Sequence, residues 1–356
     1  MTYKKPLCLV IGAGGVGVLT AYSLFKADKS RVALVVRSDY EKCLSTGYNI
    51  QSCDYGEIKN WKPDLIYRSV EDAAKSGEFF DYIIVTTKNI PDGPSPVYAT
   101  IKPVIKSNIK NWPSLNSSCS IVLIQNGIDI EHEVIDLLHR EGSAKNKFNL
   151  LSGVQMIGSI KVGQCEIKHQ SKDSVLIGPF DPNDQEAVKK SHEFVKMYDT
   201  PENFVTFDHN VRFSRWKKLM YNATINTMTA IVHLDYSRCL EFGKNTTEAG
   251  IIRPAMNEIM AIAKSEGYEI DPETATILIE ADRDLVYKPS MLVDVEKTQL
   301  MELEVIIGNP LKVAKKNNVA TPSLKMLYYL LVIIQGRIKE KQGTLIFDEN
   351  TARVVQ

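Results

Sequence analysis

The sequence lacks an excess of charge, since 43 Lys and Arg residues balance 43 Asp and Glu residues and the formal net charge is zero. A chain without net positive charge has no global attraction to nucleic acid or to an anionic membrane. It also lacks a long apolar run, because the longest one, Leu327 to Ile334, is too short to cross a bilayer. We therefore expect neither nucleic acid nor a membrane as a partner.

The cysteines are few and unpatterned. None of the six forms a Cys-x-x-Cys pair, and together with the six histidines they give no metal-ligand spacing. We expect no bound metal, and we interpret the cysteines as reduced thiols. The N-terminus also lacks the anatomy of a signal peptide, so the sequence predicts a cytoplasmic protein. The remaining composition is that of a globular chain, and 356 residues are enough for two domains.

A glycine-rich motif follows the first apolar run. Leu7–Ile11 is typical of a strand, the motif Gly-x-Gly-x-x-Gly comes next, and a helical segment follows. In this context Gly12 permits the tight turn, Gly14 lets the backbone approach a pyrophosphate, and Gly17 lets the helix pack closely on the strand. The helix N-terminus favours phosphate binding. The predicted dinucleotide-binding residues are Gly12, Ala13, Gly14, Gly15, Val16 and Gly17.

Arg37 follows the second strand-like run, Arg31–Val36. An NAD-selective site usually carries an Asp or Glu at this place for the ribose hydroxyl. An acid would repel a 2′-phosphate, whereas an arginine would bind it, so Arg37 favours NADP(H). The alternative is a surface arginine that happens to follow a strand.

Further strand-like runs at 64–68, 81–86 and 119–125 predict a doubly wound α/β half. The last two runs end next to Lys88 and Asn126. Ligands of such sheets lie outside the carboxyl ends of the strands, so both residues should face the ligand of the glycine loop. The alternative is turn chemistry, because Asn-Gly is a favoured turn pair. We predict an extended surface connection without chemistry for residues 90–118.

Three short strands between 151 and 177, a helix at 184–197 and a strand at 204–207 complete this half. From Asn210 onward the pattern changes to helical periodicity, with runs near 211–231, 237–267, 271–286, 291–317 and 322–340. The sequence therefore predicts a Rossmann-type NADP-binding domain over residues 1–207 and an all-helical substrate domain over residues 208–356.

A narrow polar line runs along the predicted helix Arg215–Thr229. At about 100° per residue, Lys218, Asn222 and Asn226 fall on one side of it, together with Thr229. The ordinary interpretation is a solvent face, but asparagine is a poor helix former and is unusual there. A lysine bordered by apolar neighbours is also partly desolvated, which lowers its pKa towards the range useful for proton transfer.

A second polar set follows in the helical half. Ser290 and Asp294 lie at the start of a predicted helix that carries Glu302 and ends around Gly308. Taken alone, Ser290 is equally consistent with an N-cap.

In this order the residues resemble the ketopantoate reductase (2-dehydropantoate 2-reductase) family, from Gly12 to about Pro322. The family's Lys-x-x-x-Asn-x-x-x-Asn helix is matched by Lys218, Asn222 and Asn226. Its Ser-Met-x-x-Asp segment, with a Glu twelve residues after the Ser, is matched by Ser290, Asp294 and Glu302.

The resemblance implies NADPH-dependent reduction of a 2-keto acid, with 2-dehydropantoate giving pantoate for pantothenate and coenzyme A synthesis. It makes Lys218 the general acid and Glu302 the residue that anchors the substrate or balances the lysine charge. The substrate residues that it implies are Asn222, Asn226, Ser290 and Asp294. The cofactor residues are Arg37 at the 2′-phosphate, with Lys88 and Asn126 at the nicotinamide and its ribose.

Two departures concern the substrate, because Met301 replaces a Thr of the family pattern and Ile307 replaces an Asn. A reductase of a different 2-keto acid or carbonyl is therefore an alternative. A non-catalytic NADPH-binding regulator is another, although a regulator needs no proton donor. The sequence does not determine the oligomeric state, and a homodimer is one state that it allows.

Overall fold

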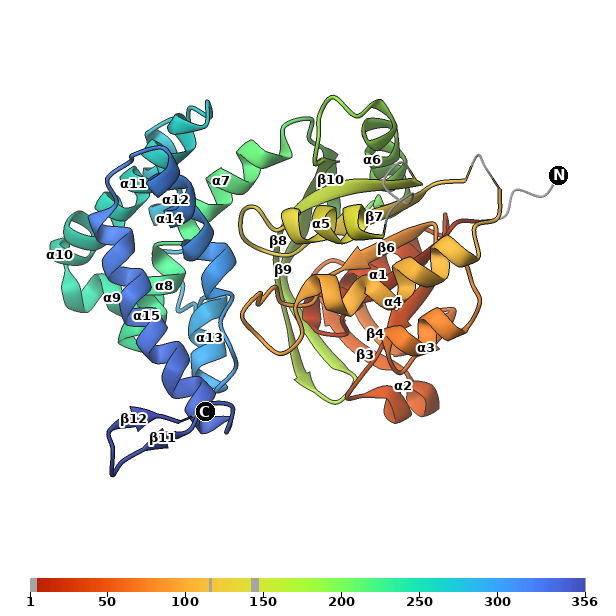
Figure 1. The fold of residues 1–356 in the computed structure, drawn as a ribbon, viewed down its shortest axis with the longest axis horizontal. Helices are drawn as coiled ribbons and strands as arrows, with labels where there is room; N and C mark the ends of the chain where they lie inside the picture. Colours follow the sequence, from red (N-terminus) through yellow and green to blue (C-terminus); the bar gives the residue numbers. More distant parts are fainter. Residues whose placement is uncertain (1–4, 115–116, 142–146, 356) are drawn as a thin grey trace. The chain divides into compact units, whose positions relative to one another are not determined.

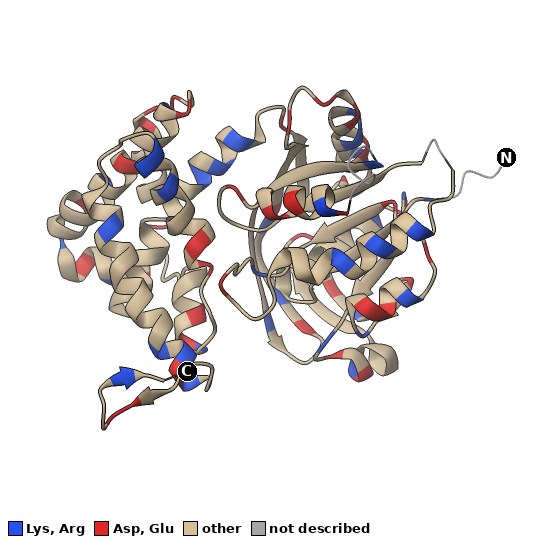
Figure 2. Ribbon diagram, viewed as in Figure 1, with Lys and Arg blue, Asp and Glu red and all other residues tan. Residues whose placement is uncertain are grey.

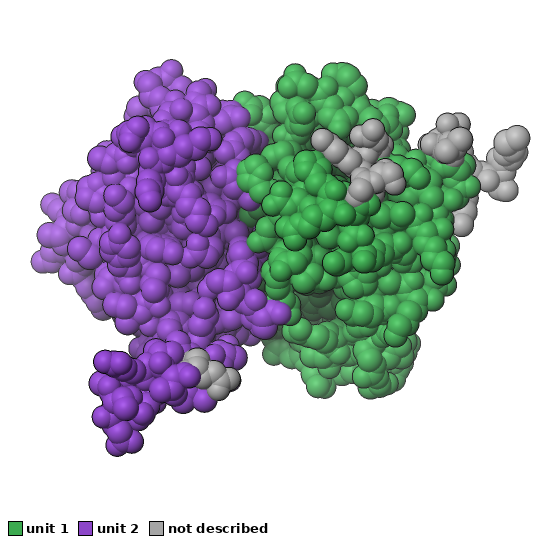
Figure 3. Space-filling view, in the orientation of Figure 1, with its two compact units in different colours: residues 1–88, 95–125, 130–211 green, residues 89–94, 126–129, 212–356 purple. Residues whose placement is uncertain are grey.

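The chain divides into two compact units (Figure 3), and the computed structural model describes residues 5–114, 117–141 and 147–355. The first unit comprises residues 1–88, 95–125 and 130–211. The second comprises residues 89–94, 126–129 and 212–356. Two short segments that interrupt the first unit in sequence therefore belong to the second.

A ten-stranded sheet forms the centre of the first unit (Figure 1). Its strands are β1 (Leu7–Ile11), β2 (Arg31–Val35), β3 (Tyr48–Ser52), β4 (Gly56–Trp61), β5 (Leu65–Tyr67), β6 (Tyr82–Val85), β7 (Cys119–Leu123), β8 (Phe148–Gly163), β9 (Glu166–Pro179) and β10 (Phe204–Phe207). They follow the order β4-β3-β9-β8-β7-β6-β1-β2-β5, and β10 pairs with β9. The central strands are parallel and buried, which explains their continuous apolar sequences.

In the sequence, each helix of the first unit lies between two of these strands. They are α1 (Gly15–Lys26), α2 (Tyr40–Thr46), α3 (Val70–Lys75), α4 (Val97–Lys110), α5 (His132–Arg140) and α6 (Gln185–Tyr198). Side-chain caps start two of them: Ser69 accepts the backbone N–H of Asp72 at α3, and Asp184 accepts two N–H groups at α6.

Helix α4 corrects the prediction of an extended connection over residues 90–118. Val97, Ile101 and Val104 are buried on one face at helical spacing, and α4 packs against α3. Pro103 inside the helix, together with several Lys and Asn residues, hides this periodicity in the sequence. Residues 115–116 of the predicted connection lie outside the described residues.

The β8–β9 hairpin replaces the three short strands predicted between 151 and 177. Its antiparallel register runs from the pair Leu151 and Pro179 to the pair Gly163 and Glu166, with irregularities along the way. The bulges shift the alternation of buried and exposed residues, so the sequence pattern looks like shorter pieces.

The second unit is built mainly of helices. They are α7 (Val211–Asn222), α8 (Ile225–Val232), α9 (Tyr236–Gly243), α10 (Asn245–Thr247), the π-helical turn η2 (Glu248–Ile252), α11 (Arg253–Ser265), α12 (Glu273–Glu280), α13 (Ser290–Glu296), the π-helical turn η3 (Glu304–Gly308), α14 (Asn309–Lys316) and α15 (Pro322–Lys341). A short hairpin of β11 (Phe347–Asp348) and β12 (Arg353–Val354) follows. The predicted fold class, a Rossmann-type sheet followed by a helical domain, is confirmed.

The single helix predicted for 215–229 is wrong, because α7 ends at Asn222 and α8 begins at Ile225. Thr224 between them has φ −120° and ψ −68°, outside helical values. The Thr227 hydroxyl donates to two carbonyl oxygens of the break, both at 2.8 Å. Threonine hydroxyls thus compete with the helical hydrogen bonds at this point.

The helix predicted to run from Ser290 through Glu302 is also shorter than expected. Helix α13 ends at Glu296, and Thr298 reverses the chain with φ 54°. Glu302 lies outside a helix, directly before the segment that leads into η3. Gly308 is the last residue of η3 and continues into α14, so it does not end a helix as predicted.

Acidic and basic residues are interspersed along both units (Figure 2), in keeping with the formal net charge of zero. Among the described residues, no helix has both the length and the apolar character needed to span a membrane.

Candidate active site

Lys218 belongs to a chain of hydrogen bonds within the second unit. Its Nζ donates to Asn126 Oδ1 at 2.8 Å. Asn126 Nδ2 donates to Glu302 Oε2 at 3.1 Å, and Glu302 Oε1 accepts the backbone N–H of Asn89 at 2.9 Å. One amide therefore orients both the ammonium group and the carboxylate. Asn126, predicted as a cofactor residue, lies directly between the two predicted catalytic residues.

The environment of Lys218 lowers its pKa to about 8. Burial is the largest cause, the positive charge of Arg215 adds to it, and the Glu302 carboxylate opposes both. Arg215 is itself buried, and its guanidinium donates to the Gly127 carbonyl at 3.0 Å. The sequence prediction missed this arginine, although its position one helical turn before Lys218 was a usable signal.

Asn226 joins a second group of polar side chains across the break between α7 and α8. Its Nδ2 donates to Asn222 Oδ1 at 3.2 Å and to Ser290 Oγ at 3.4 Å. Its Oδ1 is buried and has no hydrogen-bond partner among the described residues. A buried carbonyl oxygen left in this state costs about 1–3 kcal/mol, so this atom is suited to accept a hydrogen bond from a ligand hydroxyl.

Helix α13 contributes Ser290, which is exposed and is the first residue of the helix. The N-cap is Pro289, so the N-cap alternative for Ser290 is wrong. Asp294 lies one turn further along α13 and is buried. Thr229, the fourth member of the polar line, donates to carbonyl oxygens of its own helix.

The segment 126–129 is anchored by its own backbone. Ile128 N–H donates to Val305 O at 3.0 Å, and Asn309 Nδ2 donates to Ile128 O at 2.9 Å. Gly127 has φ 95°, and a Cβ there would lie 2.5 Å from Val305 O. The Asn-Gly pair is therefore a required turn that also holds the Asn126 amide in the cluster.

The two departures from the family pattern lie inside the second unit. Met301 and Ile307 are both fully buried. The backbone of Met301 is held by Gln335, whose amide accepts its N–H at 3.0 Å and donates to its oxygen at 3.2 Å. Gln335 therefore fixes the backbone directly before Glu302, and Ile307 is buried within η3.

The glycine loop lies in the first unit and has the geometry that a dinucleotide needs. Gly12 has φ 119°, and a Cβ on Gly17 would lie 1.9 Å from Gly12 O. A Cβ on Gly14 would meet no atom within 4 Å, so the space over this residue is open. Gly14 is the N-cap of α1 and no side chain caps the N–H groups of the first turn, the place at which a helix can bind a phosphate.

Arg37 and Lys88, the other predicted cofactor residues, also lie in the first unit, and both are exposed. Arg37 comes two residues after β2, and Lys88 comes three residues after β6. Each lies just beyond the carboxyl end of a parallel strand, the edge at which sheets of this type bind ligands.

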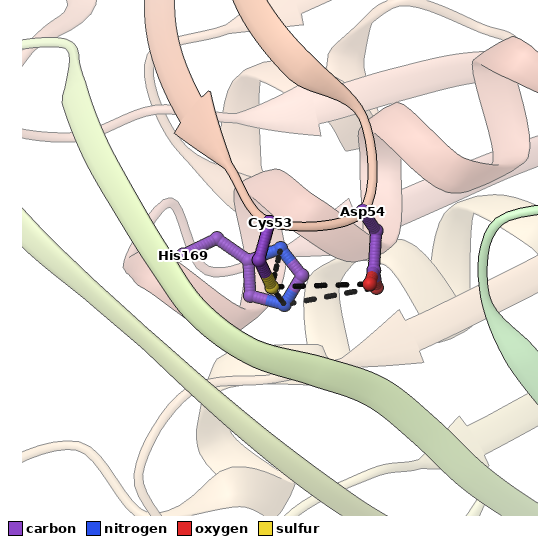
Figure 4. A group of neighbouring side chains, drawn as sticks. All are labelled: Cys53, Asp54 and His169. Carbon is purple, nitrogen blue, oxygen red and sulfur yellow. Dashed lines mark hydrogen bonds and ion pairs between the residues drawn. The ribbon is translucent and has the colours of Figure 1, made fainter.

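Cys53, Asp54 and His169 form a separate cluster (Figure 4). Ser52 Oγ accepts two backbone N–H groups, so its own hydrogen points to His169 Nδ1, 2.8 Å away. His169 Nε2 lies 2.7 Å from the carbonyl oxygen of Ser171 and must donate to it. Both ring nitrogens are therefore used within the protein, and neither offers a lone pair to a metal.

A Rossmann-type unit followed by a helical unit with a partly buried lysine is an architecture of NAD(P)-dependent oxidoreductases. The family model described as ketopantoate reductase PanE/ApbA matches residues 8–182. The model of its C-terminal domain matches residues 210–335. The chain therefore belongs to the ketopantoate reductase family.

Individual relatives cover nearly the whole chain. An uncharacterized protein of Saccharomyces cerevisiae is 53% identical over 355 residues, which is 98% of each chain. The crystal structure of 2-dehydropantoate 2-reductase from Methylococcus capsulatus is 28% identical, covers 93% of this chain and 97% of its own, and has a TM-score of 0.73. D-Mandelate dehydrogenase, in a ternary structure with NADH and anilino(oxo)acetate, is 20% identical with a TM-score of 0.73 over 94% of this chain and 99% of its own. The last comparison shows a shared fold.

Proposed function

We propose that the protein uses NADPH to reduce a 2-keto acid, with 2-dehydropantoate as the leading substrate and pantoate as the product. In this proposal residues 1–207 bind the cofactor and residues 208–356 bind the keto acid. The observation that carries the proposal is Lys218, a partly buried ammonium group with a lowered pKa that is fixed by Asn126 beside Glu302.

Reduction of a ketone places negative charge on the carbonyl oxygen. The Lys218 ammonium donates a hydrogen bond to that oxygen and then transfers its proton to it, which gives the hydroxyl group of the product. The Asn126 amide holds Nζ in one direction, and the Glu302 carboxylate keeps the lysine protonated. NADPH, when bound, supplies the hydride.

The neighbouring polar groups fix the substrate. Asn226 Oδ1, which is buried without a partner, accepts a substrate hydroxyl, and Ser290 Oγ and the Asn222 amide border the same place. Asp294 lies one turn from Ser290 and supports this wall. In the other unit the open space over Gly14 accepts the pyrophosphate, and Arg37 binds the 2′-phosphate.

The direct test is NADPH oxidation in the presence of 2-dehydropantoate and a panel of other 2-keto acids. Turnover of 2-dehydropantoate with the highest kcat/KM supports the full proposal. Turnover of another keto acid alone keeps the reductase and removes this substrate. NADPH binding without any turnover contradicts the reductase and leaves the non-catalytic regulator.

A reductase of a different 2-keto acid or carbonyl is the second candidate. It is favoured by Met301 and Ile307, which are more apolar than the family pattern and are both buried. A shifted Glu302 would change the shape available to the substrate, so the panel should include keto acids with larger apolar side chains.

Asn226→Ala is expected to raise the KM for the keto acid about two- to tenfold with a smaller effect on kcat, because one hydrogen bond to the substrate is worth about 0.5–1.5 kcal/mol. Thr229→Val is the matched control, since the Thr229 hydroxyl donates within its own helix. Steady-state kinetics of both variants check the prediction. An equal rise in KM for the two variants would mean that Asn226 acts through helix packing.

The rate of reduction should fall as the pH rises through about 8, the pKa of Lys218. The general acid works in its protonated form, so activity is full below this pH and is lost above it. Glu302→Gln removes a charge that raises this pKa, so the descending limb should move to lower pH. Profiles of kcat/KM for both proteins measure the shift, and a descending limb that stays in place would show that Glu302 does not act on Lys218.

A further inference from the structure

The β8–β9 hairpin reaches the end of β2, where the cofactor's adenosine end is expected. Lys161, near the tip of the hairpin, places its Nζ 2.6 Å from Asp39 Oδ1 and 3.1 Å from Ser38 Oγ. The backbone N–H of Cys165 donates to Asp39 Oδ2 at 2.8 Å. Two segments more than 120 residues apart thus meet directly after Arg37.

Asp39 is the acid nearest to the place where an NAD site carries its ribose-binding carboxylate, but it is turned inward. Only 2% of its side chain is exposed. Both carboxylate oxygens are used, since Oδ1 also accepts the Ser38 hydroxyl at 3.0 Å. Burial raises the pKa of Asp39, but the hydrogen bonds from Lys161, Cys165 and Ser38 outweigh it and leave the pKa lowered. The group therefore stays charged and serves as an anchor.

Lys161 keeps one donor for a ligand. An ammonium group has three N–H bonds, and the contacts with Asp39 and Ser38 use two of them. Its side chain is 30% exposed, and both Arg37 and Ser38 beside it are exposed. The Asp39 charge is balanced by Lys161, so the Arg37 guanidinium gives this edge a local positive charge.

We propose that Lys161, held in place by Asp39, binds the 2′-phosphate of NADPH together with Arg37 and thereby sets the preference for NADPH over NADH. A free Asp39 carboxylate would repel a 2′-phosphate. In the structure this carboxylate instead holds Lys161 of the β8–β9 hairpin, whose ammonium group attracts a 2′-phosphate. Lys161 is a specificity residue and Asp39 a positioning residue. The inference rests on the proposed use of NADPH.

The test is binding of two adenosine fragments, 2′,5′-ADP and 5′-AMP, measured by calorimetry without any keto acid. Lys161→Gln should weaken the binding of 2′,5′-ADP about tenfold and leave the Kd of 5′-AMP within about twofold. Tenfold is the lower end for loss of a hydrogen bond between charged groups, because the site is partly exposed. Arg37→Gln should act in the same way. Lys161→Arg, which keeps the charge, should retain most of the preference.

Lys168→Gln is the matched control, because it removes an exposed lysine from β9 of the same hairpin and should change the Kd of neither fragment. Retained 5′-AMP binding shows that the first unit of Lys161→Gln is folded. If the wild type prefers 2′,5′-ADP and Lys161→Gln leaves the ratio of the Kd values for 2′,5′-ADP and 5′-AMP unchanged, the role of Lys161 is overturned. The proposed use of NADPH then remains intact. A wild type without this preference would overturn both.

Discussion

Replacing Lys218 with alanine is expected to lower kcat by about 100-fold or more, the range that loss of a positioned general acid produces. The substrate would then have to take its proton from water, and the developing charge on oxygen would lose its ammonium partner. The glycine loop and Arg37, which are predicted to bind the phosphates of the cofactor, lie in the other unit, so the Kd for NADPH should change much less than kcat. Steady-state oxidation of NADPH at saturating keto acid measures kcat, and a parallel binding titration measures the Kd.

Lys217→Ala is the control for this variant. Lys217 is the exposed neighbour in α7, and its Nζ lies 5.7 Å from the centre of the Phe213 ring. The substitution removes the same charge from the same helix without touching the cluster, so kcat should stay within about twofold of wild type, as for other surface changes. A Lys218→Ala enzyme with near-normal kcat, or two variants that lose activity equally, would end the assignment of Lys218 as the general acid.

The fold class was predictable because its signals are local. The buried parallel strands are continuous apolar runs, Gly12 directly follows the first strand, and Gly17 lies in the first turn of the first helix. Helix α4 was missed because Pro103 and its polar neighbours obscure the apolar face that the structure buries. The end of α7 was missed because the hydroxyl groups of Thr224 and Thr227 break a pattern that is otherwise helical.

The candidate site was predictable only in part, because the sequence pattern shows only those relations that are local along the chain. The spacing of Lys218, Asn222 and Asn226 is a property of neighbouring turns, and in the structure Asn226 is hydrogen-bonded to Asn222, whereas Lys218 is hydrogen-bonded to Asn126. The bridge through Asn126 joins residues 92 positions apart and depends on the anchored turn of residues 126–129, which no local pattern encodes. Lys161 is a similar case, since its partner Asp39 is 122 residues away.

The second large effect concerns the glycine loop. Gly17→Ala places a Cβ 1.9 Å from the carbonyl oxygen of Gly12, a backbone atom that no side-chain rotation can move. Alanine gains about 1 kcal/mol of helix propensity, but overpacking against backbone costs about 1–3 kcal/mol or more, so the variant should be less stable. The displaced Gly12 turn should also weaken NADPH binding about tenfold or more. Thermal unfolding and a binding titration measure the two effects.

Gly14→Ala separates binding from folding in the same loop. Gly14 has φ −82° and ψ −173°, which alanine adopts freely, and its added Cβ meets no protein atom within 4 Å. Thermal stability should therefore equal that of the wild type. The methyl group would occupy the open space that we assign to the pyrophosphate, and loss of hydrogen bonds to a charged group costs about 1.5–3 kcal/mol, or roughly tenfold and more in Kd. If Gly14→Ala binds NADPH normally, the phosphates do not lie over this residue, and the assignment of the loop fails even though its fold is intact.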